Sequence, residues 1–446
     1  MKLPVLASLF AAGACFAQPG ALDLSFNPGS GPSGSASRIL AMSLTPSGQI
    51  LVAGFFTAFN GFPSQYVARL NADGSFDPTF YVGTGPDEVV STVASQANGD
   101  VLISGSFSFV NGLYQPHIAR LRADGSLDLT FTNIANAGVN ALVNLNNGGC
   151  LAAGYFSSVN GITMNNLARF SSNGNLDMSF NPAAISGGSG SVQAVAVQSN
   201  GFVVIGSDFT NVGGYSYQCV ARLNAAGGVD TSFVGPGLIG PSSSAITAIV
   251  IETNGQMIVG GRFTSIDGYS ELGVARLNSD GSLDTTFLTA VGTESTGVFA
   301  VQNNGKVLEE GTAGLQRLNA DGSLDTSFAV TVPAYGVYSM AVQPDGRILF
   351  AGGFSQVDGT NISGIARLLG DSASQAGVQL LNMNLYPGMF LSGSIGTNYR
   401  IEYTTSLTPP SLWTPLTNLT MTTTPVFIPD PTLPQGSRFY RAVTLP

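Results

Sequence analysis

The sequence is poor in charge, in lysine and in helix-forming residues. Charged residues make up 9% of its 446 residues, the net charge is −10, and the two lysines are Lys2 and Lys306. Nucleic acids and anionic membranes attract proteins through basic patches, so this composition argues against both as partners. No window carries the i, i+3, i+4, i+7 apolar pattern of a helix. With 57 glycines, the chain is predicted to be all-β, with short strands and tight turns.

Long apolar runs are also missing, so no transmembrane segment is expected. Met1-Lys2 followed by the apolar run Leu3 to Phe16 is instead typical of a secretory signal. We expect a signal peptide over residues 1–17, cleaved after Ala17, and therefore a protein that is secreted or at the cell surface. The segment ending at Cys15 also resembles a poor lipobox, and lipid attachment there is the minor alternative.

Cysteine and histidine are too scarce for the usual reactive sites. Cys150 and Cys219 are the cysteines left after cleavage, and we expect two buried free thiols instead of a disulfide framework. The one histidine, His117, occupies a repeat position where other units carry unrelated residues, which suggests a peripheral side chain. Histidine triads and metal sites are disfavoured, and no Walker loop or Gly-x-Ser-x-Gly elbow occurs. We assign no catalytic, cofactor-binding or metal-binding residue.

What is present is a repeat. The stretch Ala68 to Phe80 recurs, with small changes, every 41 to 54 residues. Its Asp-x-x-Phe element begins at Asp23, Asp77, Asp128, Asp177, Asp230, Asp284 and Asp325. Its arginine falls at Arg69, Arg120, Arg169, Arg222, Arg276, Arg317 and Arg367. A fixed period of this length means a solenoid, a propeller or an array.

Turn residues divide each unit into four predicted strands. In the first unit these are 39–44, 49–57, 66–70 and the segment through Phe80, separated by Pro46-Ser47-Gly48, Asn60-Gly61 and Ala72-Asp73-Gly74. Four antiparallel strands repeated seven times predict a seven-bladed β-propeller over residues 18–369. The sixth unit has a trimmed loop. Because the chain starts with a lone Asp-x-x-Phe and the array ends with a lone Arg367, we expect residues 22–26 to pair with the last blade and close the ring.

The spacing of arginine and aspartate is eight residues in all six complete hairpins, Arg69 with Asp77 through Arg317 with Asp325. A three-residue turn at Ala72-Asp73-Gly74 places the two residues opposite each other, within reach of a cross-strand ion pair. Arg367 takes Asp23 as its partner if the ring closes. The functional alternative is a ring of seven arginines that binds an anion, and we favour the structural pair.

The Ala-Arg-Leu-Asn-x-Asp-Gly-Ser-Leu-Asp-x-x-Phe pattern, as at 275–287, resembles the delta-60 repeat of secreted bacterial proteins, a predicted β-propeller family. The resemblance covers residues 22–369. The fourth unit departs from it, because Ala226 replaces the aspartate of the turn. The family offers no catalytic residues to transfer, so the resemblance implies a fold and export.

A different module follows the repeats. Residues 370–377 are predicted to be a linker and residues 378–446 a small β-sandwich with Trp413, Phe427 and Phe439 in its core. Segments such as 396–403 and 438–441 are similar to a terminal module of exported proteins from Verrucomicrobia-like bacteria. That similarity implies sorting or surface attachment, with a passive appended domain as the equal alternative.

Two local patterns have chemical interpretations that we do not favour. Asn71, Asp73, Ser75 and Asp77 alternate oxygen atoms, but glycine comes too early for an EF-hand, so we expect a plain turn. Glu309 and Glu310 are adjacent on a strand and point to opposite faces, so we expect a solvated pair instead of a joint acid/base site.

The loops after the second strands hold varied aromatic residues and suit a binding surface. Examples are Phe62, Tyr114, Tyr215, Tyr217 and Tyr269, and packing of each loop onto its own blade is the alternative. We therefore expect an exported, monomeric, non-catalytic binding or scaffold protein whose partner is an extracellular protein or a glycan. The alternative is a polysaccharide lyase or hydrolase with carboxylates at the propeller mouth.

Overall fold

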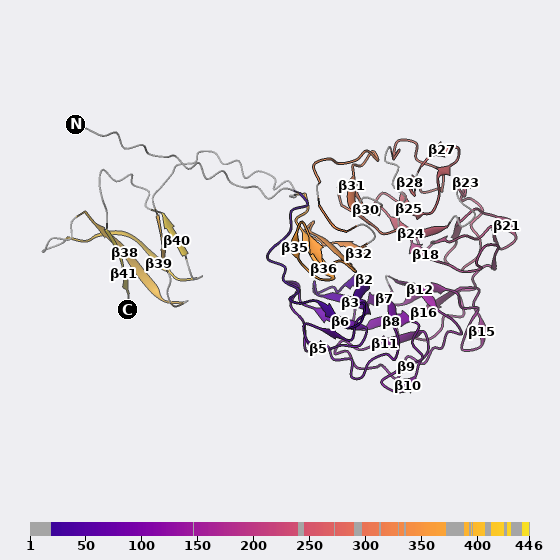
Figure 1. Cartoon of the computed structure of the whole chain (residues 1–446), viewed down its shortest axis with the longest axis horizontal. Helices are drawn as coiled ribbons and strands as arrows, with labels where there is room; N and C mark the ends of the chain where they lie inside the picture. The colour runs from indigo at the N-terminus through magenta and orange to yellow at the C-terminus, as the bar shows by residue number, and fades with distance from the viewer. Residues whose placement is uncertain are drawn as a thin grey trace. The chain divides into compact units, whose positions relative to one another are not determined.

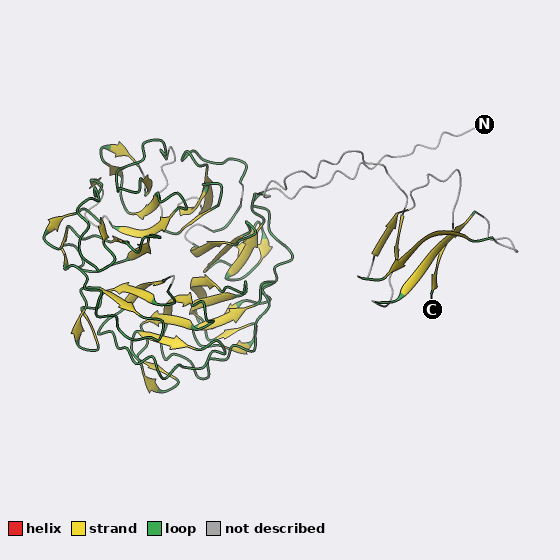
Figure 2. Cartoon of the chain, turned by 180° about the vertical axis from the view of Figure 1, so that it is seen from behind, coloured by secondary structure: helices red, strands yellow, loops and turns green. Residues whose placement is uncertain are grey.

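The computed structural model describes residues 19–145, 147–239, 245–271, 273–289, 297–311, 314–328, 330–333, 336–371, 388–391, 394, 396–405, 412–422, 426–429 and 439–445. The chain divides into two compact units, with the boundary between Ala373 and Ser374. The described residues contain strands and loops and no helix (Figure 2). None of them therefore forms a helix that could cross a membrane. The predicted signal peptide 1–17, including Cys15, and residues 372–377 of the predicted linker lie outside these ranges.

In the described part of the first unit, seven antiparallel three-stranded sheets share one arrangement, with an inner, a middle and an outer strand in that order. The inner strands are β2 (Arg38–Leu44), β7 (Val90–Ser95), β12 (Val139–Asn144), β18 (Ala194–Val197), β24 (Ile246–Ile251), β29 (Phe299–Val301) and β32 (Val337–Val342). The middle strands are β3 (Ile50–Phe55), β8 (Val101–Gly105), β13 (Cys150–Gly154), β19 (Val203–Gly206), β25 (Met257–Gly261), β30 (Val307–Gly311) and β33 (Ile348–Gly352). The outer strands are β6 (Val67–Leu70), β11 (Ile118–Leu121), β16 (Leu167–Phe170), β22 (Val220–Leu223), β28 (Val274–Leu277), β31 (Gly314–Leu318) and β36 (Ile365–Leu368).

The seven sheets are arranged in a circle. Inner strands of successive sheets contact one another, and β32 of the last sheet contacts β2 of the first (Figure 1). Apolar side chains fill the spaces between neighbouring sheets; one cluster joins Ile39 and Val52 of the first sheet to Leu349 of the last. This is a seven-bladed β-propeller, in which stacked blades cover each other's apolar faces. The predicted sixth blade is present, with β30 and β31 joined by a shorter connection.

The two ends of each blade carry different turns. Every inner strand leads into a tight first turn, such as Asn98-Gly99, and the outer strand returns to the same face. We call this the first-turn face. At the opposite face, all blades except the sixth carry a small hairpin. These hairpins are β4–β5 (Ala58–Phe59, Phe62–Pro63), β9–β10 (Phe109–Val110, Leu113–Tyr114), β14–β15 (Ser158–Val159, Ile162–Thr163), β20–β21 (Asn211–Val212, Tyr215–Ser216), β26–β27 (Ser265–Ile266, Tyr269–Ser270) and β34–β35 (Gln356–Val357, Thr360–Asn361).

Three of these hairpins gain a third strand from the chain that enters their own blade. The added strands are β1 (Pro32–Ser33), β17 (Ile185–Ser186) and β23 (Leu238–Ile239), which pair with β4, β20 and β26. At the hairpin tip, Asn60 and Gly61 have φ values of 50° and 77°. Two successive residues with positive φ make the turn whose twist suits a two-residue hairpin, as Asn-Gly predicts. The hairpins lie at the periphery of the ring in Figure 1.

The fourth strand predicted for each blade is wrong, because the chain forms only a short paired segment there. In the first blade the segment after Gly74 pairs with the outer strand through one bridge, Leu70 with Phe76, and through the amide of Asp77, which donates to the carbonyl of Arg69 at 2.9 Å. The chain then turns, because Asp77 Oδ1 accepts hydrogen bonds from the amide and hydroxyl of Thr79. A side chain that caps its own backbone competes with continuation of a strand. Each blade therefore has three strands and a short outer segment.

One position in the repeat requires a left-handed backbone. It comes just before or at the start of each outer strand and has a φ between 62° and 91° in all seven blades, at Tyr66, His117, Asn166, Cys219, Gly273, Gly314 and Gly364. In the second blade the amide of His117 donates to the carbonyl of Phe107, and its carbonyl accepts from the amide of Gly105. The variable side chains at this position therefore reflect a backbone requirement. Cys219 and Asn166 are buried here, so the position is not peripheral in every blade.

This backbone requirement gives a prediction for His117. Replacement by glycine, which blades 5 to 7 already carry, is expected to leave the free energy of unfolding unchanged or to raise it by up to about 1 kcal/mol, because left-handed φ is costly for residues with a Cβ. His117→Val is expected to lower it by about 1–2 kcal/mol, because β-branched residues tolerate this region worst. Urea titration of both variants measures the difference; equal effects would contradict a backbone requirement at this position.

The second unit contains two sheets. Strand β37 (Gly388–Leu391) pairs with β40 (Val426–Pro429), and β38 (Asn398–Thr404) lies between β39 (Thr414–Thr420) and β41 (Phe439–Thr444). The prediction that Phe439 belongs to a core is wrong, because its side chain is 41% exposed; Ile401 and Met421 are buried instead. Trp413 is half-buried beneath the guanidinium of Arg441, 4.2 Å from the ring centre. The side chain of Phe427 lies outside the described residues.

Candidate functional site

The repeated arginine and aspartate lie opposite each other in every blade. In the first blade, Arg69 Nε donates to Asp77 Oδ2 at 2.8 Å, and both side chains are almost completely buried. The same hydrogen bond joins Arg120 to Asp128, Arg169 to Asp177, Arg222 to Asp230, Arg276 to Asp284, Arg317 to Asp325 and Arg367 to Asp23, at 2.6–2.9 Å. Asp23 and Arg367 are 344 residues apart in the chain.

Each guanidinium also reaches the next blade, which the repeat spacing alone does not predict. Arg69 Nη1 donates to the carbonyl of Ala123, in the outer turn of blade 2, at 2.6 Å. The equivalent bonds are Arg120 to Ser172, Arg169 to Ala225, Arg222 to Ser279, Arg276 to Ala320 and Arg367 to Ala72. The accepting residue is always alanine or serine. This regularity of the outer turn was the one feature of the sequence that could have indicated a contact with the next blade. Arg317 instead contacts the Asp371 carboxylate at 3.0 Å.

A phenylalanine completes each arginine site. The guanidinium carbon lies 4.5–5.4 Å from the ring centre of the Asp-x-x-Phe phenylalanine in all seven blades. This geometry is a cation–π contact. The serine or threonine two residues after the aspartate completes the set, as Thr79 does for Arg69 at 3.2 Å. The donors of the guanidinium therefore point to groups of the protein, which leaves few for an external anion.

The aspartates of these sites have lowered pKa values. Burial opposes ionisation of Asp77, but hydrogen bonds from Thr79 and the charge of Arg69 outweigh it and lower its pKa. The same balance of burial against hydrogen bonds and arginine charge lowers the pKa of Asp284 to about 2. A lowered pKa contributes stability above the ordinary value near 4, and this contribution is lost as the pH falls towards the folded-state pKa. The pairs are therefore expected to be intact at neutral and mildly acidic pH.

The end of the repeat array contacts the start of the chain. The amide of Asp23 donates to the carbonyl of Arg367, and the amide of Leu369 donates to the carbonyl of Ala21, both at 2.8 Å. Leu22 forms a bridge with Leu368. Asp371, predicted to belong to the linker, accepts hydrogen bonds from Asn304 and lies 3.4 Å from Lys306 Nζ. The propeller's contacts therefore extend beyond residue 369.

The prediction that Glu309 and Glu310 are solvated is wrong. Both lie on the middle strand β30 and are 2% and 0% exposed. Glu310 Oε1 accepts from the amide of Gly336 in blade 7 at 3.0 Å. Burial raises the pKa of Glu309 to about 7. The equivalents of Glu309 in the other blades are Val52, Ile103, Ala152, Ile205, Val259 and Phe350, so in the sixth blade carboxylates stand in an otherwise apolar core.

Cys150 and Cys219 are buried thiols that form no disulfide, as predicted. Burial raises the pKa of the Cys150 thiol to about 12 and that of Cys219 to about 11. Because the thiolate is the reactive form, both are expected to be inert in the folded protein. The turn that could have suggested a calcium loop has the hydrogen bonds of a plain hairpin turn. Asp73 Oδ1 accepts from the amide and the hydroxyl of Ser75.

The hairpins of blades 1 to 5 each expose a large apolar residue directly after the turn glycine. These residues are Phe62, Leu113, Ile162, Tyr215 and Tyr269, with exposed fractions of 41–52%. We call them the hairpin rim. Blade 7 has Thr360 at this position and blade 6 has no hairpin. Tyr114 is also exposed. Tyr217 is buried instead, and its hydroxyl donates to the carbonyl of Asp230 at 3.2 Å.

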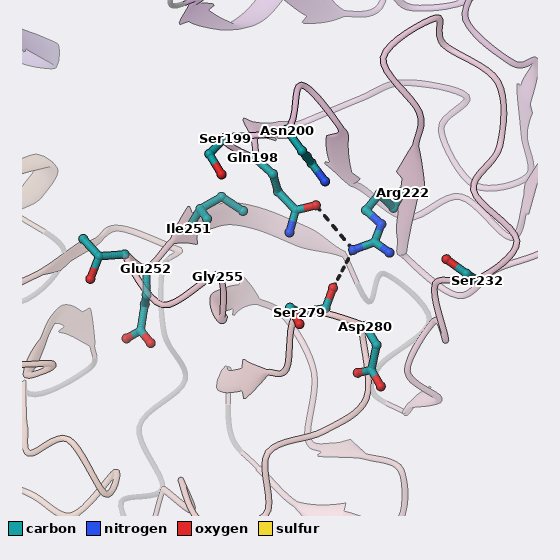
Figure 3. Close-up of a pocket in the computed structure, with 11 residues that line it drawn as sticks. Gln198, Ser199, Asn200, Arg222, Ser232, Ile251, Glu252, Gly255, Ser279 and Asp280 are labelled. Atoms are coloured by element: carbon teal, nitrogen blue, oxygen red, sulfur yellow. Dashed lines mark hydrogen bonds between the residues drawn. The ribbon is translucent and has the colours of Figure 1, made fainter.

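The first-turn face has pockets between blades. Figure 3 shows one of about 590 Å³ between blades 4 and 5, lined by Gln198, Ser199 and Glu252 among others. Its arginine, Arg222, is held by Gln198 Oε1 and by the carbonyl of Ser279. Among the described residues, no group of three or more histidine, cysteine or acidic side chains is placed to hold a metal ion.

The fold and the repeat site together define a seven-bladed repeat β-propeller. A family model described as a β-propeller domain of unknown function, DUF5122, matches residues 45–80, 96–131, 145–180, 198–233, 252–287, 302–328 and 343–373. These segments are more than half of the chain, and the chain belongs to this family. Six of them end at the phenylalanine of the Asp-x-x-Phe element. No curated protein matches the sequence.

The solved structures that match this chain are distant from it in sequence. The extracellular domain of a one-component system protein from B. thetaiotaomicron is 11% identical, with a TM-score of 0.50 over 76% of this chain and 39% of that one. The extracellular domain of a hybrid two-component system protein from the same organism is 12% identical, with a TM-score of 0.45 over 74% and 40%. PorZ, a surface component of the type-IX secretion system of Porphyromonas gingivalis, is 13% identical, with a TM-score of 0.45 over 90% and 58%. This chain thus spans less than two thirds of each, and the first similarity supports the propeller fold.

Proposed function

We propose that the protein is an exported, non-catalytic binding or scaffold protein, and that its hairpin rim binds an extracellular protein or glycan. The observation that carries this proposal is the series of exposed apolar residues at one hairpin position in five successive blades. Exposed apolar groups repeated on a rigid ring favour an interaction surface over chance exposure. A fold relative that is an extracellular domain is in keeping with export.

Further parts of the proposal concern how the protein is exported, how its ring is held closed and what its C-terminal module does. A signal peptide over residues 1–17 directs export and is removed after Ala17. Residues 22–26 then close the ring by pairing with the last blade, which removes a free sheet edge. The arginine sites serve as structural links within and between blades. The C-terminal module, residues 378–446, serves attachment or sorting. The repeats themselves are of the delta-60 type, which their motif resembles.

The rim is tested with a triple variant, Leu113→Thr, Tyr215→Thr and Tyr269→Thr, which gives these blades the residue type of Thr360 in blade 7. Mature protein is applied to arrays of extracellular bacterial proteins and of glycans. We expect the triple variant to bind the partner about tenfold or more weakly, because apolar anchors dominate such contacts. The control replaces Leu24, Leu129 and Met178 by threonine; these are at least as exposed but belong to the Asp-x-x-Phe segments. Equal losses in both variants would contradict a rim site.

A further inference from the structure

Three neighbouring pockets on the first-turn face each share lining residues with the next, and we call the three together the trough. The first, of about 290 Å³, lies between the first turns of blades 1, 2 and 3. The second, of about 350 Å³, lies between blades 3 and 4 and shares Asn144 and Leu145 with the first. The third is the pocket of Figure 3, between blades 4 and 5, which shares Gln198, Ser199 and Asn200 with the second. The trough therefore follows five successive blades around the ring axis.

The trough is lined by amide and hydroxyl side chains beside small apolar ones. Its amides are Gln96, Asn144, Asn147, Gln198 and Asn200. Its apolar residues in the first pocket are Leu44, Pro46, Ala97 and Leu145. No aromatic residue lines the three pockets within the part of the chain that the structure describes. Side-chain amides present donors and acceptors together, which matches a peptide backbone, whereas sugar rings are usually held against an aromatic face.

The first pocket contains hydrogen-bond acceptors that the protein does not use. Gln96 is 4% exposed, and its Nε2 donates to the carbonyl of Gly148 at 3.1 Å. Its Oε1 has no hydrogen-bond partner among the described residues, and the same holds for the hydroxyl of Ser95, which is 6% exposed. Leaving a buried acceptor unused is costly. An N–H group of a bound chain would supply a missing donor once a turn of the Gln96 side chain exposes its oxygen.

The third pocket is lined by two carboxylates, Glu252 and Asp280, and by one arginine that other groups already engage. Arg222 is engaged by Asp230, by Gln198 Oε1 and by the carbonyl of Ser279. Glu252 Oε1, in contrast, is buried with no hydrogen-bond partner among the described residues. Asp280 lines the same pocket. A cationic group of a ligand would be favoured at this end.

We propose that the trough binds an extended polypeptide segment of another protein, with its main chain along the amides and a basic group at the blade 5 end. The trough lies on the face opposite the hairpin rim, so this site goes beyond the rim and does not depend on it. An extended chain suits a long, shallow trough with repeated amides, because its N–H and C=O groups alternate along its length.

The test uses short random peptides displayed on phage with free N-termini and selected on the mature full-length protein. Enriched peptides are synthesised, and their Kd is measured by fluorescence polarisation. We expect enrichment of a basic residue and about tenfold or more weaker binding to Ser199→Trp, which fills the wall shared by two pockets. Asn303→Trp is the matched control, because it has the same exposed turn position in blade 6 and lines none of the three pockets.

Two further variants distinguish binding in the trough from binding at the rim. Glu252→Gln is expected to weaken binding of the basic peptides about threefold to tenfold, and the triple rim variant is expected to bind them as the unaltered protein does. Failure to enrich any peptide, or equal affinity of Ser199→Trp and Asn303→Trp, would overturn the proposal. So would loss of peptide binding in the rim variant, or a glycan whose binding Ser199→Trp blocks. If the hairpin rim binds nothing on the arrays, the peptide test of the trough can still succeed or fail, because the two tests use different variants.

Discussion

Asp23→Ala is expected to lower the free energy of unfolding by about 3–5 kcal/mol. Asp23 and Arg367 are 6% and 7% exposed as side chains, and removal of the carboxylate leaves the guanidinium buried without its counter-charge. The same guanidinium donates to the carbonyl of Ala72 in blade 1 and lies over Phe26. One substitution therefore weakens contacts within the last blade and between the last blade and the first.

The control for this prediction is Asp177→Ala, which removes the same role from a more exposed pair. Its arginine and aspartate are 21% and 28% exposed, so solvent screens the charge that remains, and the expected loss is about 1 kcal/mol or less. Both variants are measured by urea titration at pH 7. If the two lost equal stability, burial would not be what makes the Asp23–Arg367 pair important.

Replacement of Glu309 by valine is expected to stabilise the protein at pH 7 by roughly 3 kcal/mol. Burial raises the pKa of Glu309 to about 7 in the folded chain, from an ordinary value of 4.5. The unfolded chain therefore releases this proton first, and stability falls as the pH rises from about 4.5 to about 7, by about 1.4 kcal/mol per pH unit. Valine also matches Val52 and Val259, its equivalents in blades 1 and 5.

Glu309→Gln separates charge from packing in this prediction. Glutamine has nearly the same shape as glutamate but does not ionise. The free energy of unfolding of this variant should therefore vary less between pH 5 and pH 7, with a slope smaller by the equivalent of about one bound proton. Burial raises the pKa of Glu252 and Glu271 in the same direction, so some slope is expected to remain. A slope identical to that of the unaltered protein would show that Glu309 does not titrate in this range.

The sequence predicts the ring well where a local rule decides the structure. Asn-Gly and Asp-Gly turns fix the hairpins, and the eight-residue spacing puts Arg69 opposite Asp77, because turn length sets register. The same rules fail where tertiary contacts decide. Nothing local to Arg69 shows that it reaches Ala123 in the next blade, and the adjacent glutamates 309 and 310 look solvated until the neighbouring blades cover them.

The candidate surfaces were predictable to a smaller extent. Aromatic residues after the hairpin turns indicated a surface, but Tyr215 is exposed and Tyr217 is buried. What distinguishes them is a tertiary contact, the hydrogen bond from the Tyr217 hydroxyl to the carbonyl of Asp230. The trough could not be predicted, because it depends on how far apart the first turns of neighbouring blades lie. Its lining residues, such as Gln96 and Gln198, are ordinary turn-flanking residues in the sequence.

The central structural claim is that one split copy of the repeat closes the ring. Amide hydrogen exchange of the mature protein tests it most directly, because the amide of Asp23 donates to Arg367 just as the amide of Asp77 donates to Arg69, at 2.8 and 2.9 Å. We expect the two amides to exchange at similar, slow rates, and Arg367→Ala to accelerate exchange at Asp23 while Asp77 stays protected. Exchange of Asp23 at the rate of an unprotected chain terminus, with Asp77 still slow, would contradict the claim.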